Sequence, residues 1–149
     1  MENDIKLIRF GLRKITTEQF AIIESNFVET ISSDINMSTG LKFGVNAEKH
    51  MISVTVSVNF SQNEKHFIIL EITCFFEILA DDWLLIYNSD LNYVELEIGF
   101  ARHVVMFTIG TIRGVLHSKT EGTNYNKFFI PTINVHDLIK ENVCIDLPK

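Results

Sequence analysis

The residues of this sequence that could perform acid–base or metal chemistry are few and widely spaced. Its five histidines lack the tight spacing of a metal site; they are His50, His66, His103, His117 and His136. His50 and His66 border the hairpin expected between them and could meet there, but solvated turn residues are the simpler interpretation. Asp81 and Asp82 could act as a carboxylate pair, yet an exposed acidic turn is the interpretation we favour.

The cysteines, serines and glycines predict no catalytic site either. Cys74 and Cys144 lie in apolar stretches without a metal or redox motif, so we expect two small buried hydrophobes in a reducing compartment. The seven glycines are dispersed and form no phosphate-binding loop. No serine or cysteine has the context of a nucleophile elbow. We therefore expect no enzyme, catalytic residue, metal or cofactor, although a site built from distant residues stays open.

Length and charge exclude further classes of protein and of partner. A chain of 149 residues favours a single domain, which would span residues 1–149. Thirteen Lys and Arg against 19 Asp and Glu give a net charge of −6 without a basic patch. That balance argues against nucleic acid and anionic membranes as partners. The longest uncharged apolar run, between His103 and Arg113, is about half of a membrane span. The start carries Glu2 and Asp4 rather than a signal pattern, so we expect a cytoplasmic protein.

The apolar content exceeds what one small core needs. Twelve Phe and 46% apolar residues in a short chain suggest that some apolar surface is covered by a partner.

The first half of the sequence predicts antiparallel strands. Alternating residues from Met51 place one apolar set on a single face: Ile52, Val54, Val56, Val58 and Phe60. A polar turn at 61–65 leads to a second strand over 66–78, which completes a hairpin. An earlier strand is expected at 35–45. A weaker strand is indicated around 8–12, followed by an irregular crossover over 16–31.

The second half predicts helices. Apolar residues spaced three to four apart favour a long helix over 93–118, although 93–98 could also alternate as a strand. Apolar residues cover most of its girth, so both a sheet and a second subunit are expected against it. An extended segment, Phe128-Phe129-Ile130, ends at Pro131. Asn134 is expected to cap a short last helix over 135–142.

This order of elements resembles the SecB-type export chaperones over about residues 5 to 142. Phe100-Ala101-Arg102 is similar to the family's aromatic-Ala-Arg element on the long helix. The Ile130–Val135 segment, followed by Asp137-Leu138-Ile139, resembles its apolar-Pro loop and Asn-capped last helix. Phe75-Phe76-Glu77-Ile78 resembles the end of its fourth strand. The chain departs from the family at Ile98-Gly99, where a proline is usual, and at 79–92, which replaces a Gly-rich segment.

The resemblance implies an α+β fold: a four-stranded antiparallel sheet, then a long helix and a short C-terminal helix. It implies an ATP-independent holding chaperone that binds unfolded or precursor polypeptides and assembles as a homotetramer, a dimer of dimers. The implied peptide-binding residues are Phe128, Ile130, Ile133, Val135, Leu138 and Ile139. The implied contact with the export ATPase uses Glu71, Phe75 and Glu77.

Two other interpretations stay open from the sequence. One is a small-molecule-binding or enzymatic α+β dimer of the hot-dog type, although its long helix normally comes early. The other is an interaction module with a SecB fold that is dedicated to one partner, such as an antitoxin.

Overall fold

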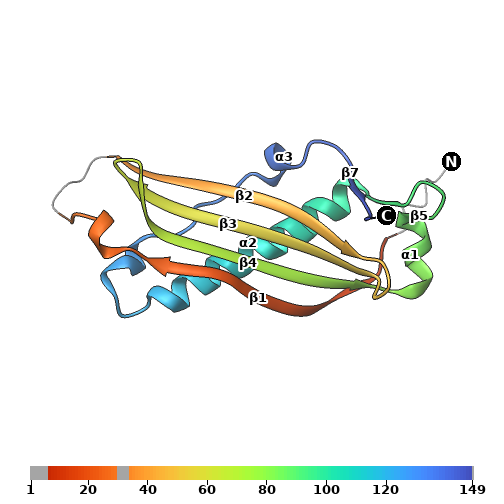
Figure 1. The fold of residues 1–149 in the computed structure, drawn as a ribbon, viewed down its shortest axis with the longest axis horizontal. Helices are drawn as coiled ribbons and strands as arrows, with labels where there is room; N and C mark the ends of the chain where they lie inside the picture. The colour runs from red at the N-terminus through yellow and green to blue at the C-terminus, as the bar shows by residue number, and fades with distance from the viewer. Residues whose placement is uncertain (1–6, 30–33, 149) are drawn as a thin grey trace.

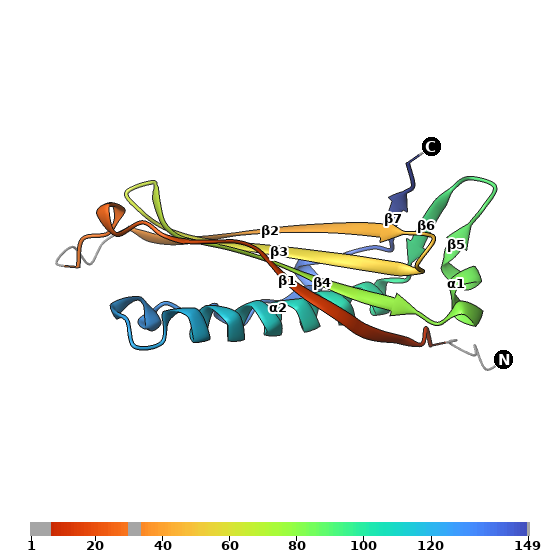
Figure 2. The same ribbon diagram turned by 60° about the horizontal axis from the view of Figure 1, so that its bottom comes forward.

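A twisted sheet with one long helix across it dominates the computed structural model, which describes residues 7–29 and 34–148 (Figure 1). The sheet has four antiparallel strands in the order β1-β4-β3-β2. Their bounds are β1 Phe10–Ile22, β2 Ile35–Asn46, β3 Met51–Gln62 and β4 Lys65–Ile78. Helix α2 (Ile98–Thr120) covers one face and leaves the other open (Figure 2). This is the expected α+β arrangement.

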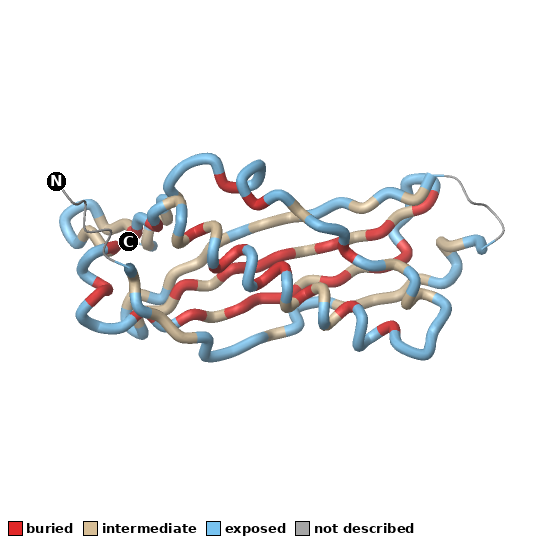
Figure 3. The backbone as a smooth tube through the Cα atoms, turned by 180° about the vertical axis from the view of Figure 1, so that it is seen from behind, coloured by how far each residue is buried: buried red, intermediate tan, exposed pale blue. Residues whose placement is uncertain are grey.

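The core lies between α2 and the two central strands. Alternating Val and Ile residues of β3 are buried on the helix side, as the period of two predicts. Every third or fourth residue of α2, including Ala101, Val105 and Ile112, is buried against them. Figure 3 shows these buried segments facing each other along the middle of the molecule.

Strand β1 is much longer than predicted. The expected irregular crossover over 16–31 is wrong for its first part, which continues β1 to Ile22; residues 30 and 31 lie outside the described residues. Register shifts between Leu12 and Lys14 and between Thr17 and Gln19 explain the error. Each bulge inserts an extra residue, so the alternation changes phase twice and no single period of two survives in the sequence.

A second, small sheet stands at one end of the first and was not predicted (Figure 2). After β4 the chain forms α1 (Ala80–Ile86), then the strands β5 (Tyr87–Asn88) and β6 (Tyr93–Leu96). The C-terminal strand β7 (Val143–Asp146) pairs with β6 and completes the order β5-β6-β7. The helix expected from Tyr93 is therefore wrong for its first residues, which form the alternative strand. Their pairing buries Val94 and Leu96.

The segment after α2 returns along the edge of the large sheet. It contains a short 3-10 turn (Asn124–Lys127) and the one-turn helix α3 (Val135–Leu138). The Asn134 side chain accepts a hydrogen bond from the His136 amide at 3.0 Å, which confirms the expected cap. The helix predicted over 135–142 is wrong beyond Leu138, because the chain extends at Ile139 and proceeds to β7.

We expect Phe67→Ala to lower the free energy of unfolding by about 3–5 kcal/mol, because its ring is fully buried and the cavity left behind cannot collapse. Urea unfolding followed by circular dichroism would measure this loss. Phe129→Ala is the matched control, since Phe129 is 70% exposed and its removal should change stability by no more than about 0.5 kcal/mol. Equal losses in both variants would contradict the assigned core.

Candidate functional site: an apolar groove beside strand β2

A cavity of about 300 Å³ lies beside β2, and we call it the β2 groove. Its walls come from β2 and β3, from α2, and from the segment around α3. The lining residues are Thr39, Gly40, Leu41, Val56, Val105, Ile109, Ile133 and Leu138. Seven of these eight residues are apolar or glycine, and none carries a charge. The groove therefore suits an apolar ligand group and supplies no acid, base or nucleophile.

Two of the six predicted peptide-binding residues, Ile133 and Leu138, line this groove. Leu138 is 41% exposed and Ile133 is half-buried. Ile130, Val135 and Ile139 instead belong to the buried core and support the groove from behind. Phe128 is half-buried in an aromatic cluster away from the lining. That these six residues bind peptide remains a prediction.

Two arginines of α2 fix the segment that forms the outer wall. Arg113 donates from Nε to the Ile130 carbonyl and from Nη2 to the Pro131 carbonyl, both at 2.9 Å. Arg102 donates from Nε to the Ile139 carbonyl at 3.0 Å. Charged donors to carbonyls give stronger hydrogen bonds than neutral ones. Both arginines lie on one side of α2, and what they bind became visible only in the structure.

Aromatic rings close the far end of the molecule, where the β1–β2 crossover meets the segment after α2. The Phe67 ring lies 4.8 Å from Phe27 and 5.0 Å from Phe128, measured between centroids. Burial raises the pKa of the neighbouring Tyr125 hydroxyl. The Gln62 side chain also holds the crossover, because it accepts from the Val28 amide at 2.7 Å and donates to the Val28 carbonyl at 3.2 Å.

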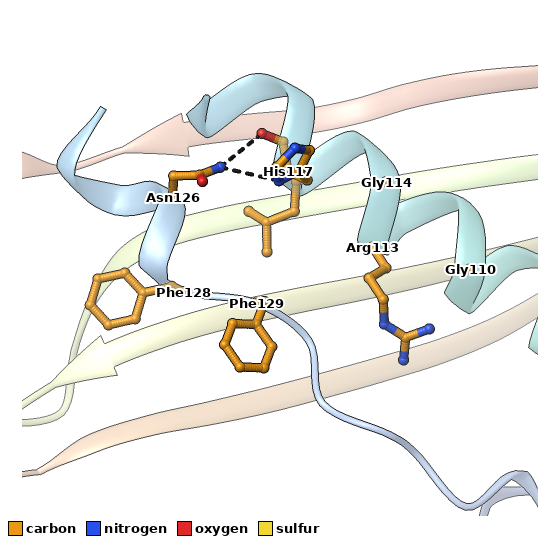
Figure 4. A pocket seen from close by; sticks show the side chains of 8 residues that line it. Gly110, Arg113, Gly114, His117, Asn126, Phe128 and Phe129 are labelled. Carbon is orange, nitrogen blue, oxygen red and sulfur yellow. Dashed lines mark hydrogen bonds between the residues drawn. The ribbon is translucent and has the colours of Figure 1, made fainter. Parts of the chain in front are cut away.

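A second cavity, of about 450 Å³, lies between α2 and the segment that follows its 3-10 turn (Figure 4). Gly110 and Gly114 put no side chain on the helix wall of this cavity, and a Cβ atom added at either position would have no neighbour within 4 Å. Phe129, 70% exposed, stands on the opposite wall. Asn126 donates to the His117 carbonyl at 3.1 Å and so joins the two walls. This site was not predicted from the sequence, in which the four-residue spacing of the two glycines was the available signal.

The residues predicted to contact the export ATPase lie on the open face of β4. Arg13 donates from Nε to the Glu77 carboxylate at 2.9 Å, and the Lys14 ammonium lies 5.7 Å from the Phe75 ring centroid. Glu71 is half-buried on the same face and belongs to none of the ion pairs found among the described residues. This face is therefore partly neutralised by β1.

Several other candidate residues have structural partners. Asp82 is buried and accepts from Arg9, with Nε at 2.9 Å and Nη2 at 3.0 Å, so the expected exposed acidic turn is wrong for this residue. The His50 ring stacks on Trp83 at 4.9 Å. Cys74 is buried as expected, whereas Cys144 is exposed because it alternates outward on β7.

Searches for metal and membrane features were negative within the described residues. Across 7–29 and 34–148, no group of three or more His, Cys, Asp or Glu side chains is placed to hold a metal ion. In the same part of the chain, no helix has the length and apolar character needed to cross a membrane.

Comparison with known proteins identifies the fold. No protein-family model and no curated protein sequence matches the chain. Among solved structures, it matches a SecB-like chaperone of Mycobacterium tuberculosis, solved in complex with a ChAD peptide from the HigA1 antitoxin. The match has a TM-score of 0.53 at 12% identity and covers 84% of this chain and 91% of that chain. The chain has a SecB-like fold.

The SecB-like fold confirms the arrangement expected from the resemblance, with the long helix after all four main strands. A protein of unknown function from Streptococcus agalactiae also matches, with a TM-score of 0.37 at 11% identity, over 87% of this chain and 99% of that chain. Helix α1 and strand β5 lie in the 79–92 segment, where the sequence departs from the SecB pattern.

We expect the contact between the β1–β2 crossover and the segment after α2 to weaken in acid. Lys127 and Asn124 both bind the Glu29 carboxylate, and these hydrogen bonds hold its pKa below the usual 4.5. A lowered folded-state pKa gives stability that is present above pH 4.5 and is lost as the pH falls through the folded value. The difference in Tm between the wild type and Glu29→Gln should therefore be present at neutral pH and shrink below pH 4.5.

Glu18→Gln is the control for this pH series, because Glu18 is exposed on β1 and lies outside the ion pairs of the described residues. A Glu29→Gln difference that persisted unchanged in strong acid would show that the carboxylate charge is not what holds the two segments together.

Proposed function

We propose that this protein acts by binding, and that it holds unfolded or partner polypeptides in the β2 groove without changing them chemically. The observation that carries the proposal is the position of Ile133 and Leu138, which expose apolar surface toward a strand edge. Burial of such surface contributes about 25 cal/mol per Å² and makes little demand on client sequence. A holding protein needs this kind of contact, since its clients share apolar character rather than a motif.

The edge of β2 supports the same proposal. Strand β2 lies at the end of the sheet order and pairs with β3 alone among the described strands. Its outer edge runs over Ile35–Asn46 and offers backbone groups to an extended peptide. Backbone hydrogen bonds would supply affinity, while the apolar pocket beside Leu41 would receive one side chain of the client.

The solved SecB-like structure supports a polypeptide ligand, since that protein was crystallised with a peptide from an antitoxin. Two forms of the proposal follow for this chain: a general holder of unfolded chains, and a module dedicated to one partner segment. Both use the same groove. A general holder would suppress aggregation of several unrelated unfolded proteins, whereas a dedicated module would act on one.

We expect the double variant Ile133→Asp, Leu138→Asp to lose most of its holding activity, because two carboxylates in the groove would each have to be desolvated by an apolar client. Light scattering of a chemically unfolded precursor protein, with and without the variant, would measure this. Leu91→Asp is the control, since Leu91 is 71% exposed and lies outside the groove lining. Circular dichroism would establish that both variants fold.

Unchanged aggregation suppression by a folded double variant would show that clients do not bind in the β2 groove. Failure of the wild type to suppress aggregation of any unfolded protein would leave the dedicated module, which native mass spectrometry with candidate partners would then test.

Assembly as a homotetramer is part of the proposal. The exposed surface of α2 presents Met106, Phe107, Gly110 and Gly114. An exposed stripe of two large apolar residues and two glycines lets another helix approach closely. A second copy of the chain on this side would cover the apolar surplus that the composition showed.

We expect Met106→Glu to dissociate the assembly by at least one step, because Met106 is 58% exposed in the single chain and a buried glutamate would have no partner charge. Native mass spectrometry gives the subunit count directly. Leu91→Glu, at a site that is 71% exposed at the end of the molecule, should leave the subunit count unchanged. A wild-type monomer would overturn the proposed assembly.

Delivery of clients to the export ATPase through Glu71, Phe75 and Glu77, in the cytoplasm, belongs to the same proposal. Glu71 is the acid of this set without an ion pair among the described residues, so it offers the freer charge to a partner.

A further inference from the structure

A cavity of about 780 Å³ lies between β1, α1, β6 and the start of α2. The small sheet stands at the same end of the molecule (Figure 2). We call this cavity the end cavity. Its lining shares no residue with the β2 groove. Its apolar lining residues include Leu7, Phe10, Leu85 and Phe100. Cavities of several hundred Å³ accommodate whole ligands or several side chains.

Exposed leucines extend this apolar surface beyond the cavity. Leu7 is 80% exposed and Leu85 48% exposed at its mouth, and the next residue of α1, Leu84, is 76% exposed. Monomeric proteins seldom leave neighbouring large apolar side chains in water without a partner to cover them. The occupant is therefore larger than the cavity itself, which favours a polypeptide over a small molecule.

The charge on the rim of the end cavity is negative. Glu95 and Glu97 line it, and no Lys or Arg is among its lining residues in the described chain. Neither glutamate takes part in an ion pair among residues 7–29 and 34–148. A neighbouring open cavity shares Glu95 and Asn142 and adds a third acid, Glu141. The apolar wall thus continues into an acidic one.

The two rim carboxylates are held in place by backbone and amide groups. Glu97 folds over the first turn of α2 and accepts from the Phe100 amide at 3.1 Å. Gly99 leaves room for this, since a Cβ there would stand 2.9 Å from the Glu97 Oε2 atom. Glu95 accepts from the Asn142 amide at 3.3 Å, and Asn142 itself accepts from the Ile98 amide at 2.9 Å. These partners are neutral, and Glu97 also faces the positive end of the α2 dipole, so Glu95 keeps the freer of the two negative charges.

We propose that the end cavity docks a segment of a partner polypeptide that carries Lys or Arg side chains next to large apolar ones. Its apolar side chains fill the space between Leu85 and Phe100, and its cations lie against Glu95 and Glu97. Opposite charges at such a site raise the association rate and exclude acidic segments. This site is separate from the β2 groove, and it stands whether or not the groove holds clients.

The test compares two fluorescein-labelled peptides on the full-length protein by fluorescence anisotropy. One peptide alternates lysine with leucine and phenylalanine, and the other has glutamate at every lysine position. We expect the basic peptide to bind at least about tenfold more tightly than the acidic one and to weaken with added salt. Leu85→Asp and the pair Glu95→Gln, Glu97→Gln should each weaken the basic peptide about tenfold or more.

Two controls keep this result distinct from the proposed function. Leu91→Asp, at the tip of the β5–β6 turn, should bind the basic peptide as the wild type does, and Leu138→Asp, in the β2 groove, should lose only the part of the binding that Leu85→Asp retains. Loss of binding in Leu138→Asp but not in Leu85→Asp would place the peptide in the groove and overturn the proposal. Equal affinity for both peptides would also overturn it. Binding of a cationic detergent monomer without binding of either peptide would assign the cavity to a small molecule and overturn the polypeptide partner.

Discussion

The burial of one face of β3 and β4 under α2 is the packing constraint on which the rest of this structure depends. Alternating Val and Ile side chains on the strands meet the apolar stripe of the helix, and both sets are removed from water together. Because one helix is narrower than four strands, the sheet still has an uncovered strip beside β2. The chain after α2 must return across that strip, and its fit there creates the β2 groove.

The arginines of α2 decide how the returning segment lies. Arg113 and Arg102 bind backbone carbonyls near its two ends, which leaves the side chains of Ile133 and Leu138 between them free to face the groove. Anchoring through carbonyls rather than side chains lets the outer wall keep apolar side chains for a ligand. The groove is therefore held by polar contacts on one side and lined by apolar ones on the other.

A larger share of the cationic side chains than of the acidic ones is used in contacts within the chain. More acids than cations are therefore left on the surface. Arg9, Arg13 and Lys127 each pair with a carboxylate of the chain itself. Three of the remaining acids, Glu95, Glu97 and Glu141, line the cavities at the end of the molecule. Large apolar side chains, among them Leu85, are exposed at the same end. Such a surface discriminates between partners by charge while it binds them by apolar contact.

The sequence by itself determined the elements whose patterns are local and unbroken. The strands at 35–46 and 51–78, the body of α2 and the Asn134 cap follow from alternation, helical spacing and turn chemistry within a few residues. These features, with their order, were enough to indicate the SecB-like fold. Only the tertiary structure decided the course of β1, whose bulges at Leu12–Lys14 and Thr17–Gln19 depend on its pairing with β4.

Tertiary structure likewise decided which apolar residues of the last segment are core and which are surface. Ile130 and Ile133 look alike in sequence, yet Ile130 is 2% exposed and Ile133 lines the groove. Arg113 binds the Ile130 carbonyl and so holds the backbone at the start of this stretch. The strand β7 and the end cavity also escaped prediction. They form only when Asn142 and the C-terminal residues meet β6 and α2 across more than forty positions of sequence, a long-range contact that no local pattern encodes.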